Sequence, residues 1–187
     1  MRKVNAHLEM TVDGVVEHPE TWADQLGVSI QEFFTPEMME DVQSAMSDTG
    51  TVLLGRRTYE QFTAAWQPRG DADPFARFLN AATKLVASNS SPPLPWGPAE
   101  VLSGDVPAAV ARLKEQDGGD VIVLGSVTLV GSLLRAGVLD QLELNIFPMV
   151  IGSGQRLFDS PSPLRLELTE SRMFGNGVIR VRYSKHP

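Results

Sequence analysis

The sequence predicts an α/β protein with a mixed, mostly parallel central sheet, helices on both faces of that sheet and an antiparallel C-terminal hairpin. Two strand–glycine–helix units, at residues 51–62 and 120–134, predict the parallel part. The hairpin is predicted by alternating apolar and polar residues over 164–173, a Gly-Asn-Gly turn at 175–177 and a returning strand over 178–183. A ligand crevice is therefore expected at the edge where the parallel strands end.

Length and composition set limits on organisation and partners. The 187 residues suffice for one domain with a full core and are too few for two, so residues 1–187 are expected to form a single domain. Hydrophobic residues make up 42% and charged residues 21%, and no apolar run could span a membrane, so we expect a cytoplasmic protein with no membrane partner. The absence of cysteine excludes disulfides and cysteine nucleophiles. A net charge of −7 disfavours nucleic acid as a partner, so an anionic ligand requires a local cluster of positive groups.

The first predicted strand covers residues 4–12 and ends at an Asp13-Gly14 turn. Side chains two residues apart share one face of a strand. Four polar residues therefore lie together on one face, where they meet solvent or line a cleft: Asn5, His7, Glu9 and Thr11.

A loop and a helix are predicted next. Residues 17–34 lack a clean period, so we expect a loop with about one helical turn over 21–26. Thr35 is a strong helix start, because proline and an acid follow it. The acids of this helix are expected on its solvent face, opposite the apolar residues; they are Glu37, Glu40 and Asp41.

A phosphate site is predicted after the strand at residues 51–54. Gly55 allows a sharp turn or a close approach of a ligand. The helix is expected to begin near Thr58, whose hydroxyl can cap it. The free N–H groups of that helix and the guanidinium groups of Arg56 and Arg57 would together attract phosphate. The alternative is that both arginines are solvated turn residues.

Short elements alternate with loops between the two units. The sequence predicts a surface loop at 67–74, a helix at 74–80, a strand at 84–87, a polar segment at 88–91, a proline-rich connection at 92–98, a strand at 99–102 and a helix at 105–116. Asp105 is the expected cap of the last helix. The proline-rich connection cannot be regular structure, because proline lacks the N–H that a strand ladder requires, and we expect it on the surface.

The clearest buried strand is predicted at residues 120–124, an apolar run typical of the middle of a parallel sheet. It ends in Gly125-Ser126, and apolar residues at helical spacing follow. Another strand is predicted over 139–147. The second unit thus repeats the strand, glycine turn and helix of the first.

Several common motifs are missing. No glycine-lysine pair exists for a P-loop, and no Gly-x-Ser-x-Gly nucleophile elbow is present. The three histidines, His7, His18 and His186, lack metal-ligand spacing, so no metal site is expected. The missing Gly-x-Gly-x-x-Gly motif at the first strand argues against an ordinary Rossmann domain.

In the order and spacing of its motifs the chain resembles the dihydrofolate-reductase fold family, and within it the C-terminal reductase domain of bacterial riboflavin-biosynthesis proteins. The resemblance covers nearly the whole chain and implies a dihydrofolate-reductase-like three-layer fold. The residues that carry it are Met10-Thr11-Val12-Asp13-Gly14, Leu53-Leu54-Gly55-Arg56-Arg57-Thr58-Tyr59-Glu60, Leu124-Gly125-Ser126, Ala136-Gly137-Val138-Leu139-Asp140-Gln141-Leu142, Pro148, and Ile151-Gly152-Ser153-Gly154 with Leu157-Phe158.

This resemblance implies NADPH as cofactor, with its pyrophosphate and adenosine side held between two helix N-termini. Hydroxyls, an amide and an arginine fork suit the adenosine 2′-phosphate, whereas an NAD site would place an acid there. Ser126 replaces a second glycine found in many relatives, so the backbone is less free to approach a ligand. The cofactor-binding residues implied are Gly55, Arg56, Arg57 and Thr58 on one side, Gly125, Ser126, Val127, Thr128 and Leu129 on the other, and Ser88, Asn89 and Ser90 near the 2′-phosphate.

The implied reaction is hydride transfer to a small heterocyclic or carbonyl substrate. Asp13, at the mouth of the cleft, is the candidate for positioning substrate or relaying a proton, although Asp-Gly is equally a turn former. In folate reductases an acid on the first helix holds the pterin, but here those acids are expected to face solvent, so folate is not assured as the substrate. Relatives in this branch are often dimers, which implies a homodimer.

Two alternative functions are kept. The first is a riboflavin-pathway reductase that acts on a phosphorylated ribosylamino-pyrimidine. The second is a catalytically silent nucleotide-binding module that has kept the fold and lost turnover.

Overall fold

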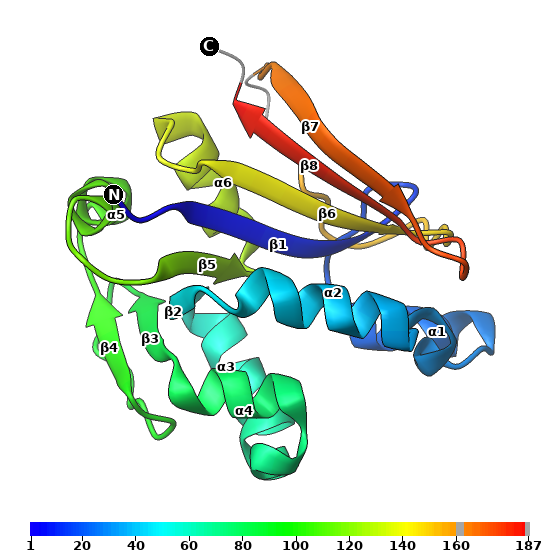
Figure 1. Cartoon of the computed structure of the whole chain (residues 1–187), viewed down its shortest axis with the longest axis horizontal. Coiled ribbons are helices and arrows are strands. Elements are labelled where there is room, and N and C mark those ends of the chain that lie inside the picture. The colour runs from blue at the N-terminus through cyan, green and yellow to red at the C-terminus, as the bar shows by residue number, and fades with distance from the viewer. Residues whose placement is uncertain (160–162, 186–187) are drawn as a thin grey trace.

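The computed structural model describes residues 1–159 and 163–185, and eight strands of this part form one sheet (Figure 1). Strands β1 to β6 pair in parallel, whereas β8 pairs antiparallel with both β6 and β7. The predicted mixed sheet with an antiparallel C-terminal edge is therefore confirmed. The strand order is β4 (Ala99–Leu102), β3 (Thr83–Ala87), β2 (Thr49–Gly55), β5 (Asp120–Leu124), β1 (Val4–Thr11), β6 (Gln141–Phe147), β8 (Ile179–Lys185) and β7 (Leu166–Met173).

Helices cover both faces of this sheet, as predicted. One core lies between the sheet and α5 and α6, and a second lies between the sheet and α2, α3 and α4. Alternation along β2 divides its apolar residues between the two, because Leu53 belongs to the first core and Leu54 to the second. The helices are α1 (Pro19–Leu26), α2 (Pro36–Met46), α3 (Arg56–Trp66), α4 (Pro74–Ala81), α5 (Val106–Lys114) and α6 (Val127–Ala136).

The segment before α2 is more regular than the sequence pattern predicts. The expected loop contains α1 and a 3₁₀ helix over Ile30–Phe33. Pro19 lies in the first turn of α1, where its missing N–H is not needed, and Gly27 ends the helix with φ at 68°. The proline and glycine that interrupt the pattern are thus the start and stop of a helix. Trp22 anchors it, being 1% exposed and packed edge-on against Phe147.

Two other predicted surface segments contain structured parts. The expected loop after α3 is a 3₁₀ helix over Gln67–Ala72. The proline-rich connection has no regular structure, as predicted, but Trp96 within it is 3% exposed. Its indole N–H donates to Asn80 at 2.8 Å, and its backbone N–H donates to the Tyr59 hydroxyl at 2.9 Å. Trp96 therefore fastens the connection to α3 and α4.

Asp73 caps α4, and its removal should weaken the protein measurably. Its carboxylate accepts the N–H groups of Phe75 and Ala76 at 2.9 and 3.0 Å. Because these two amides would lose their partner, we expect Asp73→Ala to lower the free energy of unfolding by about 1 kcal/mol in urea titrations. Asp117→Ala, at an exposed position outside any helix or strand, is the control and should change it by less than about 0.5 kcal/mol. Equal effects of the two substitutions would contradict the capping role.

Candidate functional site

The two predicted glycine turns lie against each other. β2 and β5 are parallel neighbours, so both turns emerge at the same edge of the sheet. The Gly55 N–H donates to the Ser126 hydroxyl oxygen at 2.7 Å, and the Ser126 hydroxyl donates to the Thr58 oxygen at 2.9 Å. Segments about 70 residues apart in sequence thus converge at one place, which the cofactor prediction requires.

The helix at the first turn starts earlier than predicted. α3 begins at Arg56, and Gly55 occupies the N-cap position with extended backbone and no side-chain cap. The prediction that Thr58 caps this helix is wrong, because Thr58 lies within the first turn and its hydroxyl accepts from Ser126 instead. Arg56 and Arg57 stand in that same first turn and are both exposed. Arg56 makes a loose ion pair with Glu60 at 3.7 Å, which a stronger anion could replace.

The second turn places a helix N-terminus beside the first. Gly125 and Ser126 both adopt left-handed backbone, with φ at 56° and 57°, and α6 starts directly afterwards without a side-chain cap. A Cβ on Gly125 would lie 3.2 Å from the Thr58 methyl group, so glycine lets the two turns approach closely. Thr128 is exposed, whereas the Leu129 side chain is 8% exposed and belongs to the core. Leu129 therefore offers a ligand its backbone rather than its side chain.

The predicted 2′-phosphate segment lies at the same edge. Ala87, the last residue of β3, pairs with Gly55, so Ser88 follows directly beside the first turn. The hydroxyls of Ser88 and Ser90 are 3.2 Å apart, and Asn89 and Ser90 are exposed. The strand order thus brings all three predicted cofactor segments to one edge, in the order 88–90, 55–58 and 125–129.

This donor set fits a nicotinamide dinucleotide phosphate. Two adjacent helix N-termini offer unpaired N–H groups and positive dipole ends for a pyrophosphate. Two exposed guanidinium groups and the serine hydroxyls offer donors for a phosphate monoester. No carboxylate occupies residues 88–90, where an NAD site would place one.

Asp13 joins two loops. Its carboxylate accepts the Thr11 hydroxyl at 2.7 Å and the Gly152 N–H at 2.8 Å, and Ile151 donates at 3.3 Å. The Thr11 hydrogen bond is the main cause that holds the pKa of Asp13 below its ordinary value, with the two amides adding to it against desolvation. Asp13 is therefore an ionised acceptor that ties the turn after β1 to the 151–156 loop. Its role in catalysis stays a prediction.

The polar face of β1 meets a buried charge cluster. His7 lies between two carboxylates, with Nδ1 2.7 Å from Glu143 and Nε2 3.1 Å from Glu9. A ring that donates to both must carry two protons, so His7 is an imidazolium. Burial alone would lower its pKa, but the hydrogen bonds and charges of Glu143 and Glu9 outweigh burial and raise the pKa of His7 from 6.5 to about 10. Burial would raise the pKa of Glu143, but His7 and Arg182 outweigh it and lower that pKa from 4.5 to about 2.

Asp41 extends this cluster and corrects a prediction. It was expected on the solvent face of α2, as Glu37 and Glu40 are, but it turns toward the sheet. Its carboxylate lies 2.5 Å from Arg180 and 3.0 Å from Arg172. Arg180 is 3% exposed, and a buried guanidinium requires an anionic partner, which explains the inward orientation.

Four members of the cluster were not predicted from the sequence. They lie on β6 and β8, on the same face of the sheet as the polar residues of β1, and are Glu143, Asn145, Arg180 and Arg182. Their alternation with apolar residues signals that they share a face. The pairing of β1, β6 and β8 that brings them together is long-range and leaves no local pattern.

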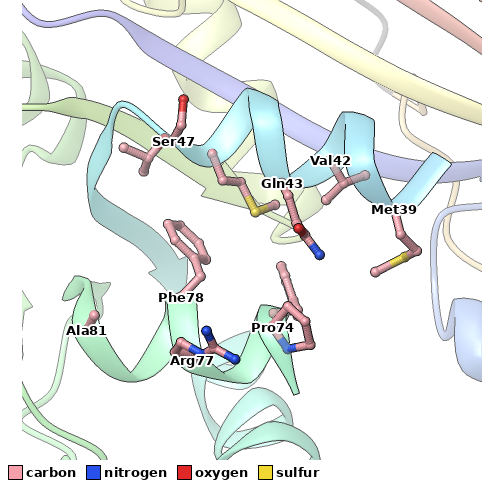
Figure 2. Close-up of a pocket in the computed structure, with 11 residues that line it drawn as sticks. Met39, Val42, Gln43, Ser47, Pro74, Arg77, Phe78 and Ala81 are labelled. Atoms are coloured by element: carbon pink, nitrogen blue, oxygen red, sulfur yellow. The ribbon is translucent and has the colours of Figure 1, made fainter. Parts of the chain in front are cut away.

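Two cavities among the described residues lie away from the glycine turns. Figure 2 shows a groove of about 390 Å³ between α2 and α4, lined by Met39, Val42, Gln43, Phe78 and others. It borders Thr49, the first residue of β2, whereas the glycine turns follow the opposite end of that strand. A second cavity of about 540 Å³ lies between α6 and the C-terminal strands. Neither is lined by a predicted cofactor residue.

The helices give no sign of a membrane span. Within residues 1–159 and 163–185, none combines the length and the apolar character needed to cross a bilayer.

Comparison with known proteins agrees with this architecture. The chain is 23% identical over 186 residues to the protein YyaP of Bacillus subtilis (strain 168), covering 97% of this chain and 94% of YyaP. A protein assigned to riboflavin biosynthesis from Shewanella sp. PV-4 superposes with a TM-score of 0.73 at 15% identity, with 99% of each chain covered. Dihydrofolate reductase from Enterococcus faecalis, complexed with NADP(H), superposes with a TM-score of 0.64 at 14% identity, covering 99% of this chain and 97% of that one. The model of the RibD C-terminal domain matches residues 2–180, so the chain belongs to the RibD C-terminal domain family.

Proposed function

We propose that this protein is an NADPH-dependent oxidoreductase that transfers a hydride to a small heterocyclic or carbonyl substrate. The observation that carries the proposal is the contact between the two glycine turns through the Gly55 N–H, the Ser126 hydroxyl and the Thr58 hydroxyl. This contact sets two uncapped helix N-termini side by side at the carboxyl edge of a parallel sheet, where ligands of α/β proteins bind.

Each segment of this edge has a proposed task. The backbone N–H groups at residues 55–58 and 125–129 would hold the pyrophosphate of NADPH. The hydroxyls and amide of residues 88–90, together with the guanidinium groups of Arg56 and Arg57, would hold the 2′-phosphate. Bound NADPH would supply the hydride. The chain itself supplies orientation and electrostatics, and Asp13 is proposed to position the substrate by fixing the loops at the mouth of the cleft.

Removal of either arginine of the first turn should weaken NADPH more than NADH. The 2′-phosphate distinguishes the two cofactors, and a charge-assisted hydrogen bond to it contributes about 1.5–3 kcal/mol. We therefore expect Arg56→Ala or Arg57→Ala to reduce the preference for NADPH over NADH by about tenfold to a hundredfold in calorimetric titrations.

The control for this measurement is Arg112→Ala. Arg112 is exposed near the end of α5, so its replacement changes the net charge equally without touching the glycine turns. NADPH affinity should stay within about twofold of the unaltered protein. Equal losses of NADPH and NADH affinity in the Arg56 and Arg57 variants would count against the assignment.

Turnover separates the remaining alternatives. Oxidation of NADPH, followed by stopped-flow absorbance with a panel of pterins and pyrimidines, should be fast for at least one compound if the protein is a reductase. A phosphorylated ribosylamino-pyrimidine as the best substrate would identify a riboflavin-pathway reductase, an alternative favoured by membership of the RibD C-terminal domain family. NADPH binding without oxidation by any compound would instead indicate the silent nucleotide-binding module. A homodimer is proposed by analogy, and light scattering would test it.

A further inference from the structure

The cavity of about 540 Å³ between α6 and the C-terminal strands has mostly apolar walls. β8 and β7 form the edge of the sheet beyond β6 (Figure 1). Leu166 and Tyr183 on this hairpin pack against the first core without being fully buried in it. The apolar walls come from the sheet, from α6 and from the segment before β7, and include Met10, Leu134, Leu144, Ile146, Leu157 and Leu166. Ligand pockets of this size and character usually contain a few polar groups that orient the ligand.

Two side chains that can donate hydrogen bonds line this cavity, and they are Arg135 and Tyr183. Within residues 1–159 and 163–185, the Arg135 guanidinium makes no ion pair or hydrogen bond, and the Tyr183 hydroxyl makes no hydrogen bond. The arginines of β7 and β8, by contrast, each pair with a carboxylate. No acid is among the described residues that line the cavity. Its donors are therefore available to an acceptor that comes from outside the protein.

The guanidinium of Arg135 lies at the cavity wall. Arg135 follows Gly131 by four residues, so the two share one face of α6, and both line the cavity. A Cβ on Gly131 would lie 3.4 Å from Arg135 Nη1, so the arginine side chain folds back over the glycine. The missing side chain at position 131 thus leaves room for the guanidinium against the helix.

Lys185 adds a positive charge near the end of α6. In the register of β7 and β8 it lies opposite Leu166, and it shares one face of β8 with Tyr183. A Cβ on Gly137, the C-cap residue of α6, would lie 3.1 Å from Lys185 Nζ. A cationic ligand in the cavity would therefore meet like charges, whereas an anionic ligand would meet opposite charges.

We propose that this cavity binds an apolar molecule that carries one carboxylate, of the fatty-acid type. The walls would hold the chain, because its burial removes apolar surface from water. The Arg135 guanidinium matches the planar carboxylate, and the Tyr183 hydroxyl would donate a further hydrogen bond to it. The inference does not depend on the proposed function, since none of the described lining residues belongs to the predicted cofactor site.

Octanoate, octanol and octylammonium are the probes, since they share one chain and differ in the head group. In titrations followed by protein NMR shifts, we expect affinity to fall in that order, with the largest shifts at residues 131–135 and 164–166. Arg135→Gln should weaken octanoate about fivefold and leave octanol unchanged. Arg112→Gln, which removes the same charge from an exposed position on α5, should leave octanoate affinity unchanged.

A second variant distinguishes a bound carboxylate from a second copy of the chain. Phe158 is 54% exposed and lines the cavity, so Phe158→Ser removes part of the apolar wall from the surface. It should weaken octanoate and octanol equally, by about threefold, and leave the molar mass from light scattering unchanged. Absent octanoate binding, octylammonium binding as tight as that of octanoate, or unchanged octanoate affinity in Arg135→Gln would overturn the inference. A dimer that Phe158→Ser converts into a monomer would also overturn it, because a second copy would then cover the cavity.

Discussion

Glu143→Gln should lower the free energy of unfolding by about 3 kcal/mol at pH 6, because it removes the buried anion that His7 and Arg182 share. Glu143 is 6% exposed and accepts from His7 at 2.7 Å and from the Arg182 guanidinium. A neutral amide of the same size would keep the packing and lose the charge between the two cations, so His7 would keep only Glu9 as an anionic partner and Arg182 would lose its more buried one. Urea titration monitored by circular dichroism measures the loss.

The matched control is Glu167→Gln on β7, which removes the same charge from an exposed side chain and should change stability by less than about 0.5 kcal/mol. The double variant His7→Gln with Glu143→Gln also removes the imidazolium that has lost one of its two carboxylate partners. It should therefore be more stable than the sum of the two single losses implies. A double variant whose loss of unfolding free energy equals the sum of the two single losses would show that His7 and Glu143 are not energetically coupled.

Stability should also fall steeply in alkaline solution. His7 binds its proton more tightly in the folded protein, with a pKa of about 10, than in the unfolded chain, where the ordinary value is 6.5. Between these values the folded state holds more protons, so raising the pH favours unfolding, and the contribution of His7 is complete only below pH 6.5. We expect a loss on the order of 3 kcal/mol between pH 6.5 and 10.

Glu143 produces the opposite dependence in acid. Its pKa is lowered from 4.5 to about 2 on folding, so its contribution is present above pH 4.5 and is lost as the pH falls toward 2. Stability should therefore be greatest between about pH 4.5 and 6.5. Urea titrations between pH 2 and 10 test both losses of stability, and His7→Gln should reduce the loss in alkaline solution. If stability falls equally steeply with rising pH in His7→Gln, a group other than His7 causes the loss.

Local signals were sufficient for much of the fold. The strand–glycine–helix units were predicted from an apolar run, a glycine and helical spacing, and all three features lie within about 15 consecutive residues. The start of α3 was misplaced because its N-cap, Gly55, has no side chain to mark it. The nearest hydroxyl, on Thr58, is used by Ser126, 68 residues away.

The buried charge cluster could not be predicted from the sequence, because it depends on the pairing of strands that are far apart in the chain. The leucines of β6 predicted a strand, but nothing local indicated that Glu143 and Asn145 on the other face would meet His7 and Glu9. The inward turn of Asp41 depends on Arg180, which lies on β8 near the other end of the chain. Charged residues on a helix ordinarily face solvent, and this buried arginine overrides that rule.

Amide hydrogen–deuterium exchange with and without saturating NADPH tests most directly whether one dinucleotide is held by both glycine turns. We predict that NADPH slows exchange at residues 55–58 and 125–129 together, since the same pyrophosphate would engage both helix N-termini. Exchange at the 390 Å³ groove between α2 and α4 should not change. Protection of one turn alone, or of neither at any NADPH concentration, would contradict a shared nucleotide site.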